Sequence, residues 1–480
     1  MQKKVLTGWK YLLAVMLCAA LLCACNDGQQ EAAPAVSETP SREEVQSDYE
    51  VTMEQREGFV GEEAYEKSFV RPQVNSNIFV DLMGYAPEDK KYAYFVGEGL
   101  SDTFYVFESA TNERVFTGSL KEMKNEKKDG KPVYKGDFSA VTEPGVYYIQ
   151  TAVIGQSYTF RIDQNRYRMQ FEELKKEFLT LSPEEYYGGH ESVKERMQIC
   201  YSFQKLVMAY EFFPDSLGQE YEKKLEEHAQ FMITMREELL LSRDEKQRKE
   251  KQRPNYADPS EMEKQMVKED YMFASAMAAG YTLLQRYNAP LAGKCLAQSQ
   301  KAYQSSARYK LSGDVQYMAS ASLFRAVGNY TYHAVIKERY VQEEAAALKP
   351  GYQMLEDART LHCDEKLWGN LFYLMSVKGS DMTICDRQMA ELMDLCGGWL
   401  SAAPKSAFGL LAPNVKSSLE NGIWLTIADY SIVSREYRSV CKEQIHALLH
   451  NMEKIDLSYE QKATMLILLG NLAESEDKEE

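Results

Sequence analysis

The chain is 480 residues long, enough for two or three domains with large buried cores. Its 44% hydrophobic, 11% aromatic and 27% charged residues are typical of a globular protein and exclude a disordered or fibrous one. The formal net charge of −16 argues against nucleic acid as a partner, because phosphate binding needs a basic surface.

The N-terminus has the pattern of a bacterial lipoprotein signal. Lysines precede an apolar run over residues 11–24, and a polar segment follows. The run ends in Leu22-Cys23-Ala24-Cys25, which resembles a lipobox, where a small residue precedes a cysteine that is acylated and becomes the new N-terminus. We therefore predict a signal peptide over residues 1–24 and a lipid anchor at Cys25, which holds the protein outside the cytoplasm at a bacterial cell surface. The alternative is an uncleaved signal anchor with incidental cysteines.

Residues 25–75 are predicted to form an acidic, flexible tether. Residues 26–66 hold twelve acids and two bases, a net charge of −10. Glu, Ser, Pro and Ala dominate this segment, and such a composition cannot bury enough apolar surface to fold. Because like charges repel, we expect an extended, solvated spacer.

The folded part begins near Asn77 with short strands separated by turn residues, which predicts an Ig-like β-sandwich over residues 76–163. Residues 156–162 alternate polar and apolar side chains, as a strand with one buried face should. Residues 143–145 read Glu-Pro-Gly, a turn in which Pro fixes φ and Gly allows positive φ. The expected strands are 78–83, 91–96, 103–108, 113–119, 146–152 and 156–162.

From Arg166 onward the apolar residues recur with a helical period to the end of the chain, which predicts about twelve helices over residues 164–480. The charged residues 243–259 are expected to form a solvated loop. Helices that follow one sandwich without further strands favour antiparallel helix pairs, arranged as a toroid or a solenoid. The expected helices are 166–180, 192–213, 219–241, 260–286, 290–308, 315–328, 331–347, 365–378, 381–402, 421–434, 436–453 and 458–474.

Six further cysteines follow Cys25, and none forms a C-x-x-C pair. Wide, irregular spacing on helical segments is typical of buried free thiols rather than of a disulfide framework or a zinc site. We predict no metal and no other cofactor. The six are Cys200, Cys295, Cys363, Cys385, Cys396 and Cys441.

One stretch resembles a known family. Phe79-Val80-Asp81-Leu82-Met83-Gly84-Tyr85-Ala86-Pro87, followed by Lys90 and Ala93, resembles the opening of the Ig-like domain that precedes the catalytic module in glycoside hydrolase family 9. Residues 134–139 ahead of residues 143–147 agree with the order of that domain. The resemblance implies an N-terminal Ig-like sandwich followed by an (α/α)6 toroid-like helical barrel, the six-hairpin glycosidase type.

In the helical region, residues 273–279, 290–292 and 319–329 look like the Ala-rich helices of the same family. The resemblance covers roughly residues 78–475. It implies hydrolysis of β-1,4-glucan chains by inversion, which needs one carboxylic acid to protonate the leaving oxygen and one carboxylate to activate water.

The family carries its base as the last aspartate of Gly-Gly-aromatic-x-Asp-Ala-Gly-Asp. Here Gly188-Gly189-His190-Glu191 begins the motif and Ser192-Val193-Lys194-Glu195 follows, so the resemblance implies Glu195 as the base. The distance to the following helix looks a few residues shorter than usual, which suggests a deleted catalytic loop. The same residues also read as a capping box, in which Ser192 and Glu195 satisfy backbone N–H groups at the start of a helix.

The family's acid is a glutamate six residues before an Asn-Ala that enters the final helix. Lys462 stands at the asparagine position, and the resemblance therefore implies Asp456 as the acid. Asp456 reads equally as a residue that caps the following helix. Glu191 with Glu453 is another possible pair.

Sugar binding needs aromatic faces for stacking, and only three tryptophans follow residue 25. Of these, Trp368 and Trp424 lie near probable helix ends and are candidate platforms, with core packing as the alternative. No nucleophile elbow and no Walker loop is present in the sequence.

Three further candidates for substrate binding flank the Gly188-Gly189 turn. Tyr186, Tyr187 and His190 are plausible wall residues of a cleft, and loop packing is the alternative.

We expect a cell-surface lipoprotein related to the cellulases and endo-β-1,4-glucanases of family 9, with an impaired catalytic dyad and a retained role in binding an oligo- or polysaccharide. The alternative is an active inverting glycoside hydrolase with Glu195 as base and Asp456 as acid, whose carboxyl groups should face one cleft about 6.5–9.5 Å apart. A weaker alternative is a structural or assembly lipoprotein without glycan contact.

Overall fold

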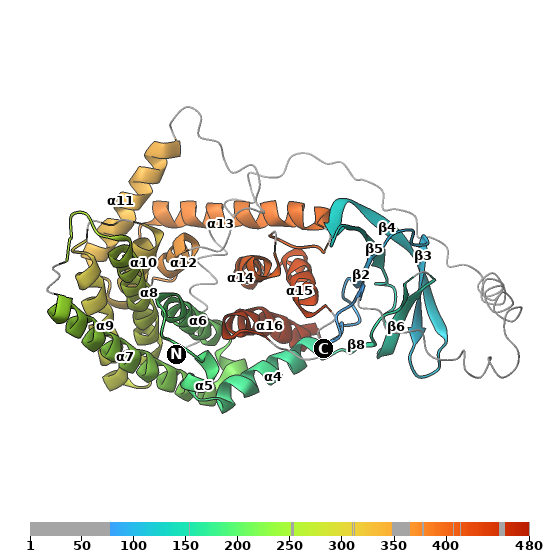
Figure 1. Cartoon of the computed structure of the whole chain (residues 1–480), viewed down its shortest axis with the longest axis horizontal. Helices are drawn as coiled ribbons and strands as arrows, with labels where there is room; N and C mark the ends of the chain where they lie inside the picture. Colours follow the sequence, from blue (N-terminus) through green and yellow to red (C-terminus); the bar gives the residue numbers. More distant parts are fainter. Residues whose placement is uncertain are drawn as a thin grey trace, which may run out of the picture.

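The computed structural model shows a β-sheet domain joined to a larger helical domain (Figure 1). The predicted signal peptide, the anchor Cys25, the tether and Asp456 lie outside the described residues. The described ranges are 77–152, 154–250, 254–309, 311, 313–347, 365–376, 379–406, 408–412, 414–450 and 457–479.

The N-terminal domain is a sandwich whose strands all pair antiparallel. The strands are β1 (Ile78–Phe79), β2 (Tyr92–Val96), β3 (Thr103–Glu108), β4 (Arg114–Lys128), β5 (Lys131–Asp137), β6 (Gly145–Thr151), β7 (Gly155–Gln156) and β8 (Phe160–Ile162). Their order is β1-β2-β5-β4-β3-β6-β7, with β8 paired to β6. The long β4 joins the two sheets, because its first half pairs with β3 and its second half with β5.

Two glycines let the sheets of the sandwich close over their core. A Cβ on Gly118 or Gly136 would approach the ring of the buried Phe104 to 2.4 or 2.6 Å, so both positions require glycine. From the sequence we expected β4 to end at residue 119 and no strand at β5. Both strands carry lysines on a solvated hairpin, which hides the alternating pattern.

The helical domain consists, within the described residues, of twelve helices and the short α5. They are α4 (Arg166–Thr180), α5 (Pro183–Tyr187), α6 (Val193–Phe212), α7 (Pro214–Glu250), α8 (Glu261–Leu284), α9 (Ala289–Ser306), α10 (Asp314–Val327), α11 (Tyr330–Ala347), α12 (Glu365–Leu374), α13 (Met382–Ala402), α14 (Val415–Ile432), α15 (Arg435–Leu449) and α16 (Tyr459–Glu479), with the 3₁₀ turn η2 (Ala403–Lys405). The expectation of about twelve helices is confirmed.

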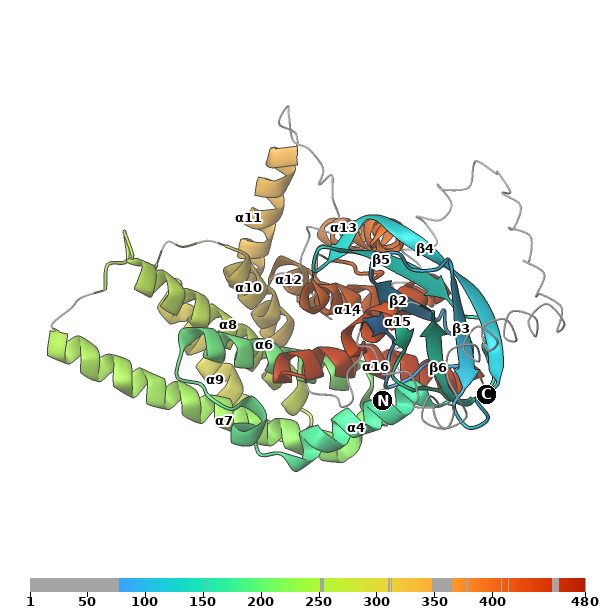
Figure 2. The same cartoon turned by 45° about the vertical axis from the view of Figure 1, so that its right-hand side comes forward.

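The helices form two rings. The inner ring is α6, α8, α10, α12, α14 and α16, and α16 packs against α6, which closes it. The outer ring is α4, α7, α9, α11, α13 and α15, and the far ends of α7 and α11 extend beyond the barrel (Figure 2). This is the predicted (α/α)6 arrangement, and it excludes the solenoid.

The charged segment 243–259 is not simply a loop, and that expectation was wrong for its first half. Helix α7 continues to Glu250. Its Arg243 donates to Glu269 and Asp270 of α8 at 2.8 and 3.0 Å. These ion pairs bind α7 to α8 at Arg243, a contact between helices that the composition alone did not reveal.

A cluster of charged residues joins the two domains, and we call it the junction cluster: Asp81, Asp89, Tyr167, Lys442 and His446. His446 Nδ1 lies 2.7 Å from Asp81 Oδ2, and Tyr167 donates to Asp89 at 2.6 Å. Lys442 donates to the other Asp89 oxygen at 2.6 Å. Burial favours neutral His446, but the bonds to Asp81 and Asp89 outweigh burial and raise its pKa to about 9. The cluster is therefore a charged connection between sandwich and barrel.

The sandwich also contacts the two segments that lead into α14 and α16. Phe408 packs on Phe79 and Tyr94, with ring centroids 5.9 and 4.7 Å apart. His450 packs on the same Tyr94 at 5.4 Å, and its backbone forms a bridge with Asp81. The sandwich thus supports the entrances to two inner helices.

The barrel is closed at its end by Glu476 of α16. The Glu476 carboxylate accepts from the backbone N–H groups of Tyr167 and Arg168, at 3.3 and 3.1 Å, and so caps the start of α4. Burial raises the pKa of Glu476 to about 7. The last helix is therefore fastened to the first.

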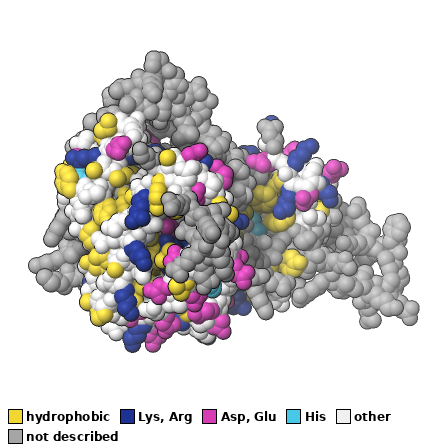
Figure 3. Space-filling view, turned by 60° about the vertical axis from the view of Figure 1, so that its left-hand side comes forward, with side chains coloured by type: hydrophobic (Ala, Val, Ile, Leu, Met, Phe, Trp, Pro, Cys, Tyr) yellow, Lys and Arg dark blue, Asp and Glu magenta, His cyan; other side chains and the backbone are white. Residues whose placement is uncertain are grey.

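The face of the molecule drawn in Figure 3 carries hydrophobic side chains together with charges of both signs. Leu241, Met262 and Tyr330 are 67%, 62% and 69% exposed. These residues lie on α7, α8 and α11.

Candidate functional site

The N-terminal ends of α6, α14 and α16 meet at one end of the barrel, which we call the barrel mouth. The ring of Tyr187, just before α6, lies 5.4 Å from the ring of Tyr459 at the start of α16. Lys416 at the start of α14 pairs with Glu460 of α16 at 2.5 Å. Glu195, the residue that the family motif implies as base, lies in the first turn of α6 at this end of the barrel.

Glu195 forms the capping box that its sequence allows. The backbone N–H of Ser192 donates to Glu195 Oε2 at 2.8 Å, and the backbone N–H of Glu195 donates to Ser192 Oγ at 3.1 Å. The bond from the Ser192 backbone lowers the pKa of Glu195, so the carboxylate stays ionised as a cap. One of its oxygens is thereby committed to the helix start.

Two other glutamates in the chain adopt the same geometry. Ser182 N–H donates to Glu185 at 2.8 Å at the start of α5, and Ser260 N–H donates to Glu263 at 2.8 Å at the start of α8. In each case the serine hydroxyl accepts in return. Glu195 is therefore held like two ordinary helix caps.

The proposed acid Asp456, and Glu453 of the other possible pair, lie outside the described residues. Tyr459, three residues after Asp456, lies beside the α6 entrance. Burial, together with the charges of Glu460 and Glu195, raises the pKa of Tyr459 to about 12. The structure thus places the start of α16 beside the entrance of α6.

Tyr186 and Tyr187 are buried, with 6% and 3% of their surface exposed. The Tyr187 hydroxyl lies 3.0 Å from Nδ1 of His228, and burial lowers the pKa of that histidine to about 3. The burial of both tyrosines agrees with packing beneath the loop, which was the alternative to a role as walls of a cleft. His190 is half-buried and sets its edge against the ring of Phe231 at 5.7 Å, so it is the candidate wall residue nearest to solvent.

Trp368 and Trp424 are each 1% exposed. Their rings contact each other edge to face at 5.4 Å, between α12 and α14. Neither ring presents a face to solvent in this structure. Their burial matches core packing, the alternative that the sequence left open.

A buried ionic network holds the turn before α6. Arg196 donates to the carbonyl of His190 at 3.0 Å and to Glu269 of α8 at 2.6 Å. Arg243 of α7 bonds to the same Glu269. The Gly188-Gly189 turn is thus tied to two further helices of the barrel.

The mouth also contains a polar group that was not predicted from the sequence. Lys205 of α6 is fully buried, and its Nζ donates to Glu420 of α14 at 2.5 Å and to Thr464 of α16 at 2.9 Å. The same Nζ lies 4.7 Å from the ring centroid of Tyr201. A lysine within the largely apolar stretch 203–209 of α6 was the available signal.

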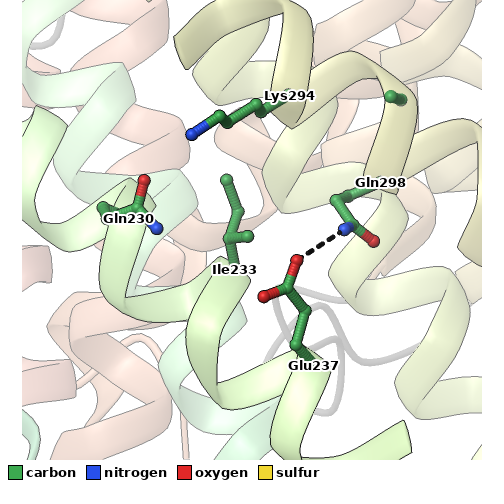
Figure 4. A pocket seen from close by; sticks show the side chains of 6 residues that line it. Gln230, Ile233, Glu237, Lys294 and Gln298 are labelled. Atoms are coloured by element: carbon green, nitrogen blue, oxygen red, sulfur yellow. Dashed lines mark hydrogen bonds between the residues drawn. The ribbon is translucent and has the colours of Figure 1, made fainter.

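Within the described residues, no group of three or more His, Cys, Asp or Glu side chains is arranged to hold a metal ion. In the same ranges no helix has the length and apolar character needed to cross a membrane. A groove of about 250 Å³ lies between the outer helices α7 and α9 (Figure 4). Its lining is Gln230, Ile233, Glu237, Lys294, Ala297 and Gln298.

A sandwich followed by an (α/α)6 barrel, with a Gly-Gly turn at the mouth, defines a six-hairpin, glycosidase-type protein. Comparison with family models agrees: the cellulase N-terminal ig-like domain matches residues 73–156, and glycosyl hydrolase family 9 matches residues 180–455. The chain belongs to glycosyl hydrolase family 9.

Individual relatives are distant. Endoglucanase D of Acetivibrio thermocellus is 34% identical over 100 residues, which are 21% of this chain and only 15% of that relative's length. A Bacteroides ovatus GH9 structure aligns with a TM-score of 0.56 at 15% identity, covering 84% of this chain and 100% of its own. A metagenome-derived family 9 endoglucanase gives 0.55 at 15% identity, covering 78% and 83%. At such identities the two structures show the fold alone.

Proposed function

We propose that this protein is a cell-surface lipoprotein that binds an oligo- or polysaccharide and whose catalytic dyad is impaired. Family membership supports a carbohydrate ligand. The main observation in favour of an impaired catalytic dyad is the geometry of Glu195, which matches the helix caps formed by Glu185 and Glu263. The lipid anchor at Cys25 rests on the sequence pattern alone.

Catalysis would depend on where the two carboxyl groups lie relative to the sugar. An inverting enzyme needs two carboxyl groups that face one sugar from opposite sides, with room for water beside the base. Glu195 is bound to the start of its own helix, and a base displaced by even 1 Å loses much of its effect. Two further carboxylates of the inner helices there, those of Glu420 and Glu460, are paired with Lys205 and Lys416.

The second candidate function is an active inverting glycoside hydrolase that uses Glu195 and Asp456. The contact between Tyr187 and Tyr459 favours it, because this contact brings the entrances of α6 and α16 together. In that case Glu195 Oε1, the oxygen to which the Ser192 N–H does not donate, would accept the proton from water.

The test compares cleavage with binding. The full chain in detergent is incubated with oligosaccharides derived from β-glucan, xylan and peptidoglycan, while reducing-end release and heats of binding are measured. Binding without release is the expected result. Release that disappears in Glu195→Gln or Asp456→Asn would establish the hydrolase and overturn the proposal.

Glu185→Gln is the matched control, since it alters an equal capping box ten residues earlier. If reducing-end release falls in Glu195→Gln but not in Glu185→Gln, the fall is due to the loss of a catalytic carboxylate rather than to the loss of a helix cap. If neither binding nor release occurs, the structural or assembly lipoprotein becomes the better explanation, and protein partners are the next search.

A further inference from the structure

Lysines gather on the hairpin formed by β4 and β5 of the sandwich. Residues 121–135 hold six lysines and three acids, a net charge of +3, in a chain whose formal net charge is −16. Lys128 and Lys135 are half-buried, and the other four lysines are exposed. We call the six residues the lysine hairpin: Lys121, Lys124, Lys127, Lys128, Lys131 and Lys135.

Two cross-strand pairs of the lysine hairpin set like charges directly opposite each other. The register places Lys121 of β4 opposite Lys135 of β5, and Lys128 opposite Lys131. Side chains at opposite positions share one face, with Cβ atoms about 5 Å apart, and like charges there destabilise a sheet. Within the described residues, the registers of the other strand pairs contain no such opposition. The hairpin therefore keeps an arrangement that repels itself.

Acidic side chains leave most of this positive charge uncompensated. Among the residues that the structure describes, no carboxylate forms an ion pair with Lys121, Lys128 or Lys131. Asp137 and Glu443 of α15 act on Lys135. Asp137 already accepts from the backbone N–H and the hydroxyl of Ser139, at 2.9 and 2.6 Å. The lysine hairpin is thus a positive surface that lacks a counter-charge.

Aromatic rings hold the two half-buried lysines in place. Lys128 Nζ lies 4.4 Å from the ring centroid of Phe79 and 5.7 Å from that of Phe408. Lys135 Nζ lies 3.4 Å from the ring centroid of Tyr92. Phe408 follows α13, and both views of the fold place β4 and β5 beside the end of that helix (Figure 1, Figure 2). These ammonium groups are therefore ordered beforehand, at the seam between sandwich and barrel, which lowers the entropy lost on binding.

The spacing of the two lysine pairs favours a chain-like anion. Residues 131 and 135 are four positions apart on β5, which corresponds to about 13 Å at the rise of a strand. One phosphate group can lie between the two ammonium groups of a pair, but only a chain with several phosphates reaches both pairs. Lysine is a common ligand for phosphate, to which it offers a compact point charge.

A flat membrane surface fits the lysine hairpin less well than such a chain. Lys121 and Lys131 are exposed, whereas Lys128 and Lys135 are half-buried beside the barrel. A planar array of lipid headgroups contacts the exposed pair without reaching the other two. A thin, flexible chain can follow the seam and contact all four.

We propose that the lysine hairpin binds a linear polyanion with repeating phosphate groups, which lies along β4 and β5 at the seam between the domains. One phosphate lies between Lys121 and Lys135, and another lies between Lys128 and Lys131. This interaction uses the sandwich rather than the barrel mouth, and it does not depend on the proposed glycan binding.

The first experiment compares anions of different length. Binding of inorganic polyphosphate and of monophosphate to the full chain in neutral detergent is measured by calorimetry. We expect the polymer to bind at least about a hundredfold more tightly, because it contacts both pairs at once. Its affinity should fall about fiftyfold between 50 and 200 mM salt when four phosphates are neutralised. Equal affinity of the two anions, or an affinity that salt leaves unchanged, would overturn the proposal.

The second experiment removes one lysine from each pair. The double variant Lys121→Gln with Lys131→Gln is expected to weaken polyphosphate binding at least tenfold. The matched control is Lys294→Gln with Lys301→Gln, which removes two exposed lysines of α9 and changes the net charge equally. Binding by the control should stay within about twofold of wild type. Equal losses in the two double variants would assign the binding to overall charge and contradict a site on the hairpin.

Thermal unfolding of the same variants tests the repulsion within the pairs. Without polyphosphate, the hairpin variant should unfold at the same temperature as wild type or above it, because the like charges no longer face each other. Added polyphosphate should raise the unfolding temperature of wild type and of the α9 control, but not of the hairpin variant. A hairpin variant that unfolds well below wild type would show that the pairs are not repulsive, and the proposal would fail.

Two competing ligands distinguish the source of the phosphate. Phosphatidylglycerol added to the detergent should leave polyphosphate binding unchanged, and displacement by this lipid would identify a membrane surface as the partner instead. A single-stranded oligonucleotide of equal charge should bind no more tightly than polyphosphate. Tighter binding would reveal contacts to bases and would overturn the proposal in favour of a nucleic acid. Saccharide binding is measured separately, so failure here leaves the proposed function standing.

Discussion

The junction cluster and the barrel mouth both contain buried charges, and they differ in what these charges join. At the junction, Asp81 and Asp89 of the sandwich bind His446 and Lys442 of α15, so that two domains are fastened together. At the mouth, Glu195 bonds to the start of its own helix.

Charges at the mouth hold inner helices to one another. Glu420 bonds to Lys205 of α6 and Glu460 to Lys416 of α14. A carboxylate that takes a proton from water must keep an oxygen free and correctly placed. The comparison shows that Glu195, Glu420 and Glu460 take part in a helix cap and in ion pairs between inner helices, and these contacts are the basis of the proposed loss of cleavage.

The largest expected effect comes from breaking the junction cluster. Asp89→Ala leaves Lys442 and His446 without one of their partners inside the protein, and losing one member of a buried ion pair typically costs about 3–5 kcal/mol. Urea unfolding measures the loss. Asp102→Ala, an exposed aspartate of the same sandwich, is the control and should change stability by less than about 0.5 kcal/mol.

The next effect is a dependence of stability on alkaline pH. The pKa of His446 is raised from 6.5 to about 9 in the folded protein, so its contribution is complete below about pH 6.5 and is lost as pH rises through 9. The shift corresponds to about 3 kcal/mol. Asp81, Asp89 and Tyr167 bond to His446, and Lys442 lies beyond Asp89. The ring of Tyr85 packs on His446 at 4.5 Å, and the charge of Glu443 also acts on it.

Urea midpoints measured from pH 6 to pH 10 test this dependence. Wild type should lose stability above pH 8, and His446→Gln should lack that part of the decline. An unchanged alkaline decline in His446→Gln would assign it to other groups and weaken the view of the junction as a charged connection.

A smaller effect is expected at the mouth. Ser192→Ala removes the hydroxyl that caps α6 and should cost about 1 kcal/mol. Ser260→Ala at the start of α8 is the matched variant, because it removes an equal cap. Similar losses in both, measured by chemical unfolding, would show that the Ser192–Glu195 pair is an ordinary cap. A much larger loss at Ser192 would point to a further role there.

The smallest effect is expected for Glu195→Gln. Glutamine also completes a capping box, so the denaturation midpoint should not move measurably. Saccharide binding should likewise stay unchanged. A clear loss of saccharide binding with an unaltered denaturation midpoint would place Glu195 in the ligand site. The mouth would then differ from the junction cluster in function, and not only in which helices its charges join.

Much of the fold was predictable because its signals are local. The helical period from Arg166 onward gave the helices, and the Ser192-x-x-Glu195 spacing gave the cap. The extension of α7 was missed because its stability comes from Arg243 bonding across to α8.

The ion pair between Lys205 and Glu420 was missed for a related reason. Lys205 and Glu420 are 215 residues apart in the chain and meet only when the inner ring forms. No motif marks such a pair, and the buried positions of Trp368 and Trp424 likewise depend on how α12 and α14 approach each other.

The cap that Glu476 places on α4 has a consequence for the order of folding. It joins residues 309 positions apart, so the barrel closes only after its last helix has docked. Contacts of such long sequence separation form slowly, because the entropy of closing the loop is lost before they contribute. We therefore expect the sandwich, whose strands pair over short distances in sequence, to fold first and to serve as the surface on which the open ring of helices finally closes.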